Sequence, residues 1–263
     1  MRNLFPALMK DSRRSLYFPF SLGHFANDFV PCSVVVLAPA IALEMGLNPM
    51  EVGLLLTLHT LGSALGFFPA GLLADSARNR GNLLVLTFWW VGLGYLLASW
   101  APGFWSLAFL FALAGCGDAA WHPLATAILV KSDPQNRGQA LGFHAVGGTL
   151  AGVVGPVIVG ILLASMDWRQ TLHLIILPTL LVGLLFFKIR KLVPEQARIK
   201  AISKADFKHL WKSWTKKTGL LIICLMSSYH MSLVAMMSMI PLYLREFHGL
   251  SSAMTGFAFG MMV

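Results

Sequence analysis

The stretch Ala112–Val130 reads ALAGCGDAAWHPLATAILV and decides the fold class of the chain. It is apolar enough to cross a lipid bilayer, yet it carries Asp118 and His122 near its middle. Residues four apart lie on one face of a helix, and an ionised carboxylate at bilayer depth costs roughly 2.5–3.5 kcal/mol on insertion scales. This face of the helix is therefore expected to turn toward protein or water.

The first hydrophobic stretch contains the same two residue types in the reverse order. His24 precedes Asp28 by four residues, so these two side chains also share a helix face. We interpret the rest of the chain as the scaffold that brings these two helices together.

Composition places the chain in a membrane. Of its 263 residues, 57% are hydrophobic and 12% are charged, whereas soluble domains carry about 25% charged residues. The net charge of +9 could indicate nucleic-acid binding, but the charges lie in short loops between apolar runs, so no nucleic-acid partner is predicted. Cys32, Cys116 and Cys224 fall inside apolar runs and indicate neither a disulfide framework nor a metal site.

Hydrophobic runs of about 20 residues predict membrane spans. The chain has seven such runs and the start of an eighth, which predicts an all-α polytopic membrane protein. The predicted spans are Leu16–Leu43, Val52–Ala74, Leu83–Trp100, Phe104–Val130, Ala140–Ala164, Thr171–Phe187, Gly219–Leu244 and a last one from Ser251 onward.

The basic residues are distributed unevenly between the two sides. Of the 20 Lys and Arg residues, only Arg169 and Arg245 fall outside the N-terminal tail and the even-numbered loops. The positive-inside rule therefore predicts a cytoplasmic N-terminus and, for a bacterial protein, the inner (plasma) membrane.

The sixth loop is basic and periodic. Phe207, Leu210, Trp211 and Trp214 recur at helical spacing, and lysines fill the other faces. This pattern is typical of an amphipathic helix on the anionic inner leaflet. The alternative is a solvated, flexible linker.

The linker also divides a repeat. Aligning Pro39 with Pro241 sets Glu44 opposite Glu246, so the seventh span restarts the pattern of the first, as in parallel-repeat transporters. The predicted units are a six-helix bundle (1–188), a basic cytoplasmic linker (189–217) and the start of a second bundle (218–263).

Ionisable groups in three predicted spans share one depth. Asp28, Asp118 and His230 lie near the middle of the first, fourth and seventh spans, which indicates a central cavity that handles protons or substrate. The other candidates for this cavity are His24, His122, Asn27 and His144. The alternative is a set of polar pairs that only lock helix packing.

Two further stretches are candidates for conformational gating. The first is the loop between the second and third spans, and the second is a glycine-rich part of the fifth span, where small residues permit close packing and proline kinks the helix. The residues are Gly71, Asp75, Arg78 and Arg80 in the loop and Gly152, Gly155 and Pro156 in the span. Ordinary tight packing is the alternative.

Enzymatic and metal chemistry are not predicted. No HxxxH or HExxH spacing occurs on a span, and there is no GxSxG stretch. We therefore assign no catalytic residue, no metal ligand and no cofactor.

The loop stretch resembles the cytoplasmic signature of the major facilitator superfamily. Gly71, Leu73, Ala74, Asp75 and Arg80 match it, whereas Ser76 and Arg78 stand where the family has a basic residue and a glycine. Gly152–Gly160 resembles the span-five signature of antiporter members. The resemblance implies a major-facilitator-type helix bundle, with a complete N-terminal six-helix half and the start of the C-terminal half.

A narrower resemblance is to the fosmidomycin-resistance-like exporters. It rests on three stretches: His24-Phe25 with Asp28, Gly115-x-Gly117 with His122-Pro123, and Val146-Gly147-Gly148 with Gly155-Pro156. That group often has an acidic residue where this chain has Leu124. The likeness implies proton-coupled efflux of a small organic molecule or drug by alternating access.

Two alternatives to export remain open. One is a proton symporter or uniporter that imports a metabolite, and the other is a non-transporting membrane scaffold. Because the family has twelve spans, we expect this chain to be a fragment that ends in span eight, and the full-length protein to be a monomer.

Overall fold

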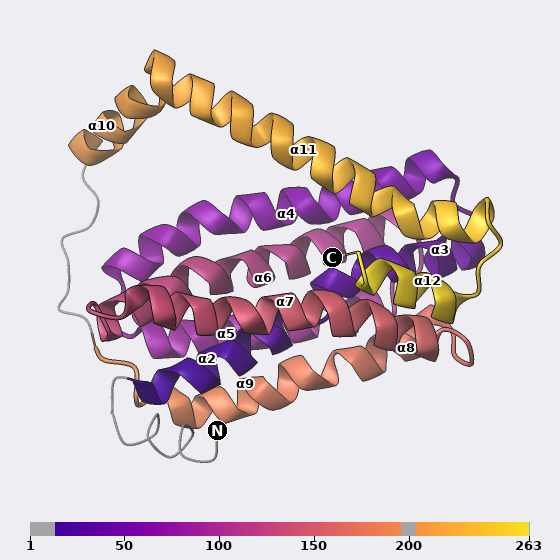
Figure 1. Cartoon of the computed structure of the whole chain (residues 1–263), viewed down its shortest axis with the longest axis horizontal. Coiled ribbons are helices and arrows are strands. Elements are labelled where there is room, and N and C mark those ends of the chain that lie inside the picture. The colour runs from indigo at the N-terminus through magenta and orange to yellow at the C-terminus, as the bar shows by residue number, and fades with distance from the viewer. Residues whose placement is uncertain (1–13, 196–203, 263) are drawn as a thin grey trace.

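The computed structural model describes residues 14–195 and 204–262, and in these ranges the chain is built from helices that run side by side (Figure 1). The elements are η1 (Arg14–Leu16), α2 (Tyr17–Asp28), η2 (Pro31–Ser33), α3 (Val34–Met45), α4 (Pro49–Ser76), α5 (Arg80–Ala98), α6 (Phe104–Ser132), α7 (Arg137–Leu162), α8 (Trp168–Ile175), α9 (Leu177–Ile189), α10 (Lys204–Trp214), α11 (Lys217–Glu246) and α12 (Ser252–Gly260).

The predicted all-α membrane fold is confirmed. Seven helical segments of the described chain are long and apolar enough to cross a membrane, and each overlaps a span expected from the sequence. The start of the eighth predicted span is α12, and part of the predicted linker helix is α10.

Two of the spans are interrupted, which the hydrophobic pattern did not predict. The first breaks between α2 and α3, where Pro31 begins the short helix η2. The sixth breaks at Ile176, just before Pro178. Proline has no backbone N–H to donate to the preceding turn, so each break follows from a residue that hydropathy alone does not weigh.

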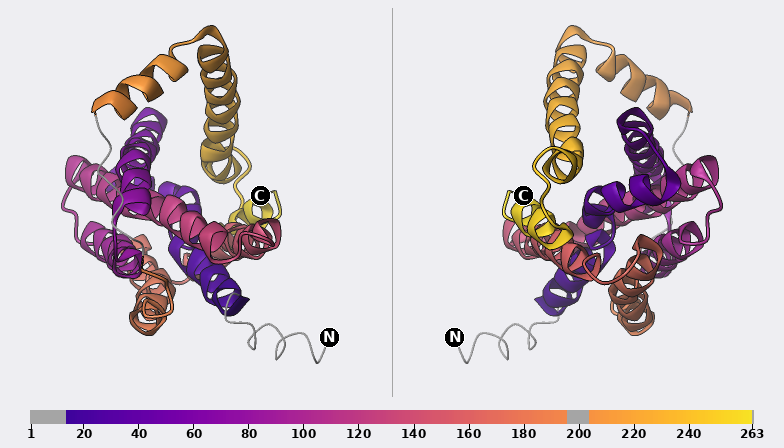
Figure 2. Two further views of the ribbon diagram at one scale, coloured as in Figure 1. Left: turned by 90° about the vertical axis from the view of Figure 1, so that its left-hand side faces the viewer. Right: turned by 90° about the vertical axis from the view of Figure 1, so that its right-hand side faces the viewer.

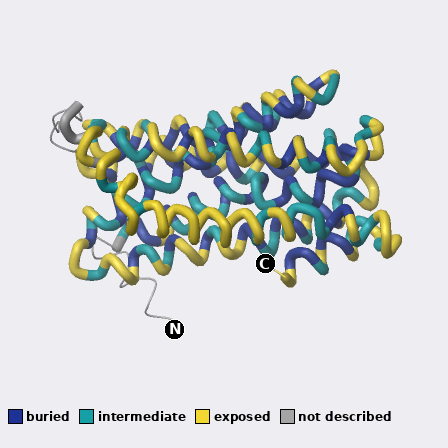
Figure 3. Tube along the Cα trace, turned by 90° about the horizontal axis from the view of Figure 1, so that it is seen from above, coloured by how far each residue is buried: buried dark blue, intermediate teal, exposed yellow. Residues whose placement is uncertain are grey.

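The first six spans bury two apolar clusters, one toward each end of the bundle. Leu37, Leu55 and Phe111 belong to one cluster, and Phe20 and Phe88 belong to the other. Along both α2 and α6 the residues change from one cluster to the other within a few positions. The C-terminal end of α2 and the middle of α6 therefore lie between the clusters, and Figure 3 shows the buried segments along the trace.

Small residues bring the helices close together. A Cβ atom on Gly62 or Gly66 of α4 would collide with the backbone of Ala112 or Cys116 of α6. Close backbone approach of this kind is how membrane helices gain packing energy without a hydrophobic driving force. The α4–α6 pair is therefore fixed by sequence positions that tolerate no side chain.

Helix α11 stands apart from the first six spans over much of its length. It packs against α3 and α12 near its C-terminal end, where Pro241 and Leu242 are buried, and it diverges from α4 toward α10 (Figures 1 and 2). A pocket of about 620 Å³ lies between α4 and α11. At the end of the molecule opposite α10, α7 and α12 pack closely, because Gly160 of α7 lies against Gly256 of α12.

Arg169 joins three segments at the end of the bundle that contains the α3–α4 loop. Its Nη1 donates to the carbonyl oxygens of Ser99 and Ala101 at 2.6 and 3.1 Å, and its Nε lies 3.0 Å from Glu44 Oε1. The guanidinium of Arg169, at the start of α8, therefore donates hydrogen bonds to carbonyls that follow α5 and links them to the end of α3.

We predict that Arg169→Gln destabilises the fold by about 1–3 kcal/mol, because hydrogen bonds to charged groups are stronger than neutral ones and the freed carbonyls lose their donor. Thermal unfolding of the purified protein in detergent measures the change. Lys188→Gln, which removes an exposed charge at the other end of the bundle, is the control. An unchanged melting temperature for Arg169→Gln would contradict the assigned role.

Candidate functional site

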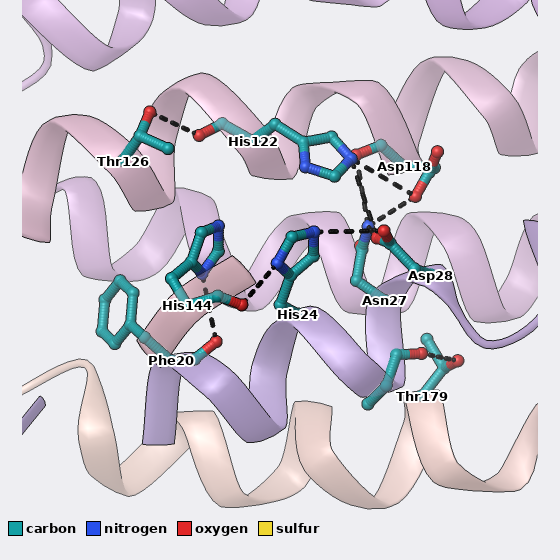
Figure 4. A network of polar contacts seen from close by, with 10 residues as sticks. Phe20, His24, Asn27, Asp28, Asp118, His122, Thr126, His144 and Thr179 are labelled. Carbon is teal, nitrogen blue, oxygen red and sulfur yellow. Dashed lines mark hydrogen bonds and ion pairs between the residues drawn. The ribbon is translucent and has the colours of Figure 1, made fainter. Parts of the chain in front are cut away.

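The two histidine–aspartate pairs expected from the sequence meet in one polar network between α2 and α6 (Figure 4). His24 Nε2 lies 3.1 Å from Asp28 Oδ2 within α2. His122 Nε2 of α6 lies 3.7 Å from Asp28 Oδ1 and 3.9 Å from Asp118 Oδ1. The second histidine therefore bridges the carboxylates of both helices.

Asn27 ties the two carboxyl groups together from the buried side. Its Nδ2 donates to Asp118 Oδ1 at 2.5 Å and lies 3.1 Å from Asp28 Oδ1. The residue is fully buried, and its own Oδ1 has no hydrogen-bond partner among the described residues. One amide thus holds the carboxyl groups of two helices close to each other in an interior that disfavours two negative charges.

The tautomer of His24 is fixed by the backbone of α7. Its Nδ1 lies 2.8 Å from the carbonyl oxygen of His144. A carbonyl oxygen only accepts, so Nδ1 carries a proton. The other nitrogen, Nε2, faces the Asp28 carboxyl group, and two acceptors at this distance would repel each other. The contact is favourable only when one more proton lies between Nε2 and Asp28.

His144 completes the network from α7. Its ring stacks on that of His24 with centroids 4.0 Å apart, and its Nδ1 lies 3.3 Å from the carbonyl oxygen of Phe20. His144 is buried, whereas the side chains of His24, Asp28, Asp118 and His122 retain between 13% and 27% of their exposure. These four groups are thus within reach of water or a small solute.

The cluster has enough donor atoms to raise the question of a metal. The donor atoms of His24, His122 and His144 lie within 4.8 Å of one another, and so do those of Asp28, Asp118 and His122. The stacked rings of His24 and His144 are nearly parallel, at 16°, so their in-plane lone pairs do not converge on one point. The side chains already have hydrogen-bonding partners in each other, and the expectation of no metal stays a prediction.

His230 lies elsewhere. The structure places it on α11 as a lining residue of the pocket between α4 and α11, together with Thr60 and Met239. It has no contact with Asp28 among the described interactions. A role for His230 in a cavity that handles protons or substrate therefore stays a prediction.

The gating candidates fall in two places. In the loop after α4, Asp75 lies 3.6 Å from Lys131, Arg78 pairs with Glu195 at 2.9 Å, and Arg80 is buried. Gly71 borders open space. These contacts link the ends of α4 and α6 and the segment after α9.

The glycines of α7 pack on both sides of the helix. A Cβ on Gly155 would meet Ser33 and Phe29 of the first span, whereas Pro156 contacts Gly256 of α12. Gly152 is also buried. The stretch thus joins the first span to α12, and the gating roles of both stretches stay predictions.

Sequence reasoning missed how Gly148 shapes the site. A Cβ atom at this position would lie 2.6 Å from Cε1 and 2.7 Å from Nε2 of His24. The absent side chain is what leaves room for the imidazole. The Gly147-Gly148 pair in the sequence was the available signal, but it did not reveal which ring fills the space.

We predict that Gly148→Ala displaces the His24 ring and destabilises the protein by about 1–3 kcal/mol, the usual cost of overpacking. Gly142→Ala on the same helix is the matched control, because nothing lies within 4 Å of the added methyl group. Thermal unfolding in detergent compares the two variants.

A double-mutant cycle identifies the cause. If the clash is with the imidazole, Gly148→Ala costs less in a His24→Ala background than in the wild type. Strictly additive effects would contradict the contact between these two residues.

Comparisons with known proteins agree with this architecture. The sequence profile of the Major Facilitator Superfamily matches residues 20–263. The chain is 34% identical over 151 residues to a probable 4-methylmuconolactone transporter of Cupriavidus pinatubonensis (strain JMP 134 / LMG 1197), covering 56% of this chain and 35% of that protein. It is 30% identical over 183 residues to a probable sugar efflux transporter of Helicobacter acinonychis (strain Sheeba), covering 68% of this chain and 46% of that protein.

Solved structures show the same fold. The structure of a bacterial homolog to the human lysosomal transporter Spinster, in an inward-facing and unoccupied conformation, superposes with a TM-score of 0.77 at 20% identity. The match covers 95% of this chain and 59% of that chain. The chain thus spans about half the length or less of the curated relatives described above.

Proposed function

The chain belongs to the major facilitator superfamily, and on that premise we propose that the full-length protein is a proton-coupled exporter of a small organic molecule that works by alternating access. The seven apolar helices found among the described residues, together with its relatives, indicate a multi-pass membrane protein. In this proposal the bound proton and the substrate take turns at the polar network of α2 and α6.

The observation that carries the proposal is the contact between His24 and Asp28. Because His24 Nδ1 donates to a backbone carbonyl, the 3.1 Å contact of Nε2 with Asp28 supports one bound proton at that position. His122 Nε2 lies within 4 Å of a carboxylate oxygen of Asp28 and of one of Asp118. Partial exposure of these groups supports exchange of that proton with water when access opens.

The arrangement of α11 supports alternating access. The α7–α12 and α3–α11 contacts close one end of the molecule, whereas α11 diverges from α4 at the other end (Figure 2). The positive-inside rule puts the diverging end in the cytoplasm. In that topology the described arrangement is open to the inside, and Asp75, Arg78 and Arg80 lie at the opening.

The energetics are sufficient for export. Moving one proton through a membrane potential of 100 mV is worth about 2.3 kcal/mol, which sustains a concentration gradient of roughly fiftyfold. The name of the sugar efflux relative supports the direction of export, and import of a metabolite stays the alternative. We propose a bacterial inner-membrane protein with a cytoplasmic N-terminus, monomeric at full length, that exports a drug-like or other organic molecule.

We predict that Asp118→Asn removes at least nine-tenths of substrate-dependent proton movement, a tenfold loss equivalent to about 1.4 kcal/mol, because the network loses one of its two carboxyl groups. The full-length protein is reconstituted in liposomes with an internal pH dye and tested with a panel of organic acids, sugars and antibiotics. Glu51→Gln is the control, because Glu51 caps α4 outside the network and Gln retains the cap. Proton movement that survives Asp118→Asn would remove this residue from the coupling site.

The direction of proton movement separates the transport alternatives. For an exporter driven by protons, we expect an outward substrate flux to acidify the cytoplasmic compartment. Flux of substrate and protons in the same direction would instead establish a symporter. Substrate flux that is independent of a proton gradient would establish a uniporter, and no flux for any substrate would favour the scaffold.

A further inference from the structure

Helix α10 presents an aromatic edge outside the bundle. Phe207, Trp211 and Trp214 recur at i, i+4 and i+7 and therefore share one face. Their side chains are 51%, 59% and 46% exposed. Large aromatic side chains that stay this exposed on a helix of a membrane protein need a partner other than water.

The flank of the same helix is basic. Lys208 and Lys212 are exposed one turn apart, and Lys216 and Lys217 follow at the junction with α11. The combination of an aromatic face with a lysine flank is typical of helices that lie in the plane of a membrane interface, with the rings at headgroup level and the ammonium groups on phosphate.

The position of α10 fits this plane. It crosses at an angle to α11 at the end of the bundle, so its axis does not follow the spans (Figure 2). Trp214 packs edge-on against Phe68 of α4, with ring centroids 6.4 Å apart. This contact anchors the C-terminal end of α10 to the first bundle and leaves the rest of the aromatic face free to enter lipid.

We propose that α10 is a binding surface for anionic phospholipid headgroups of the cytoplasmic leaflet, with Phe207 and Trp211 inserted beside them. The positive charges of Lys208 and Lys212 favour an anionic lipid over a zwitterionic one. The aromatic face of α10 favours a bilayer over a soluble acidic partner. The inference goes beyond the transport cycle and shares with it only the assignment of this end of the molecule to the cytoplasm.

The experiment uses the full-length protein in vesicles of one fixed composition, phosphatidylglycerol with phosphatidylcholine. Either lipid is brominated on its acyl chains, and quenching of tryptophan fluorescence reports which lipid lies nearest. The difference between the wild type and Trp211→Phe/Trp214→Phe isolates the emission of α10. We expect brominated phosphatidylglycerol to quench this emission more strongly than brominated phosphatidylcholine.

The lysines test the chemistry. In Lys208→Gln/Lys212→Gln the preference for phosphatidylglycerol should fall by about fivefold per lysine, the effect expected for a charge near an anionic surface. Lys188→Gln/Lys191→Gln removes two exposed charges outside α10 and should leave it unchanged. Equal quenching by the two lipids, or a preference that survives the α10 variant, would overturn the proposal. The readout needs neither substrate nor gradient, so a failure of proton coupling leaves it intact.

Discussion

The polar network depends on one hydrogen bond, from His24 Nδ1 to the backbone carbonyl of His144. At 2.8 Å this bond fixes the tautomer of the imidazole, and it is this choice that requires a proton between His24 and Asp28. The carbonyl can reach the ring only because α7 lies close against α2, where a Cβ on Gly147 would collide with the backbone of Ser21. The protonation of His24 on α2 is thus determined by α7. In the sequence, the only sign that these two helices pack closely is the adjacent pair Gly147 and Gly148.

The location of the network follows from the division of the apolar core. Asp28 and Asp118 lie where the residues of α2 and α6 pass from one buried cluster to the other, so the carboxyl groups interrupt the packing at a single depth. Contacts between α7 and α12 close one end, and α11 leaves α4 at the other. In the proposed mechanism, a proton bound at this network would lie between a closed and an open side, as alternating access requires.

The sequence predicted the large-scale fold well, because hydropathy and charge act over whole spans. The spacing of four residues, from His24 to Asp28 and from Asp118 to His122, also predicted correctly which side chains share a helix face. The hydropathy pattern did not predict the interruption at Pro31, because hydropathy does not register the missing backbone N–H of proline. Nor could spacing within one helix show that a backbone carbonyl of α7 would bind the imidazole, because such contacts depend on how helices pack.

The central claim is that His24 carries a proton on Nδ1 and shares another with Asp28. The most direct measurement is ¹⁵N nuclear magnetic resonance of the His24 ring in lipid membranes, with the signal assigned by His24→Gln and compared with Asp28→Asn. The account predicts a protonated Nδ1 in both proteins, and an Nε2 that is hydrogen-bonded through a proton in the wild type and changes in the variant. An unprotonated Nδ1, or an Nε2 signal that Asp28→Asn leaves unchanged, would contradict it.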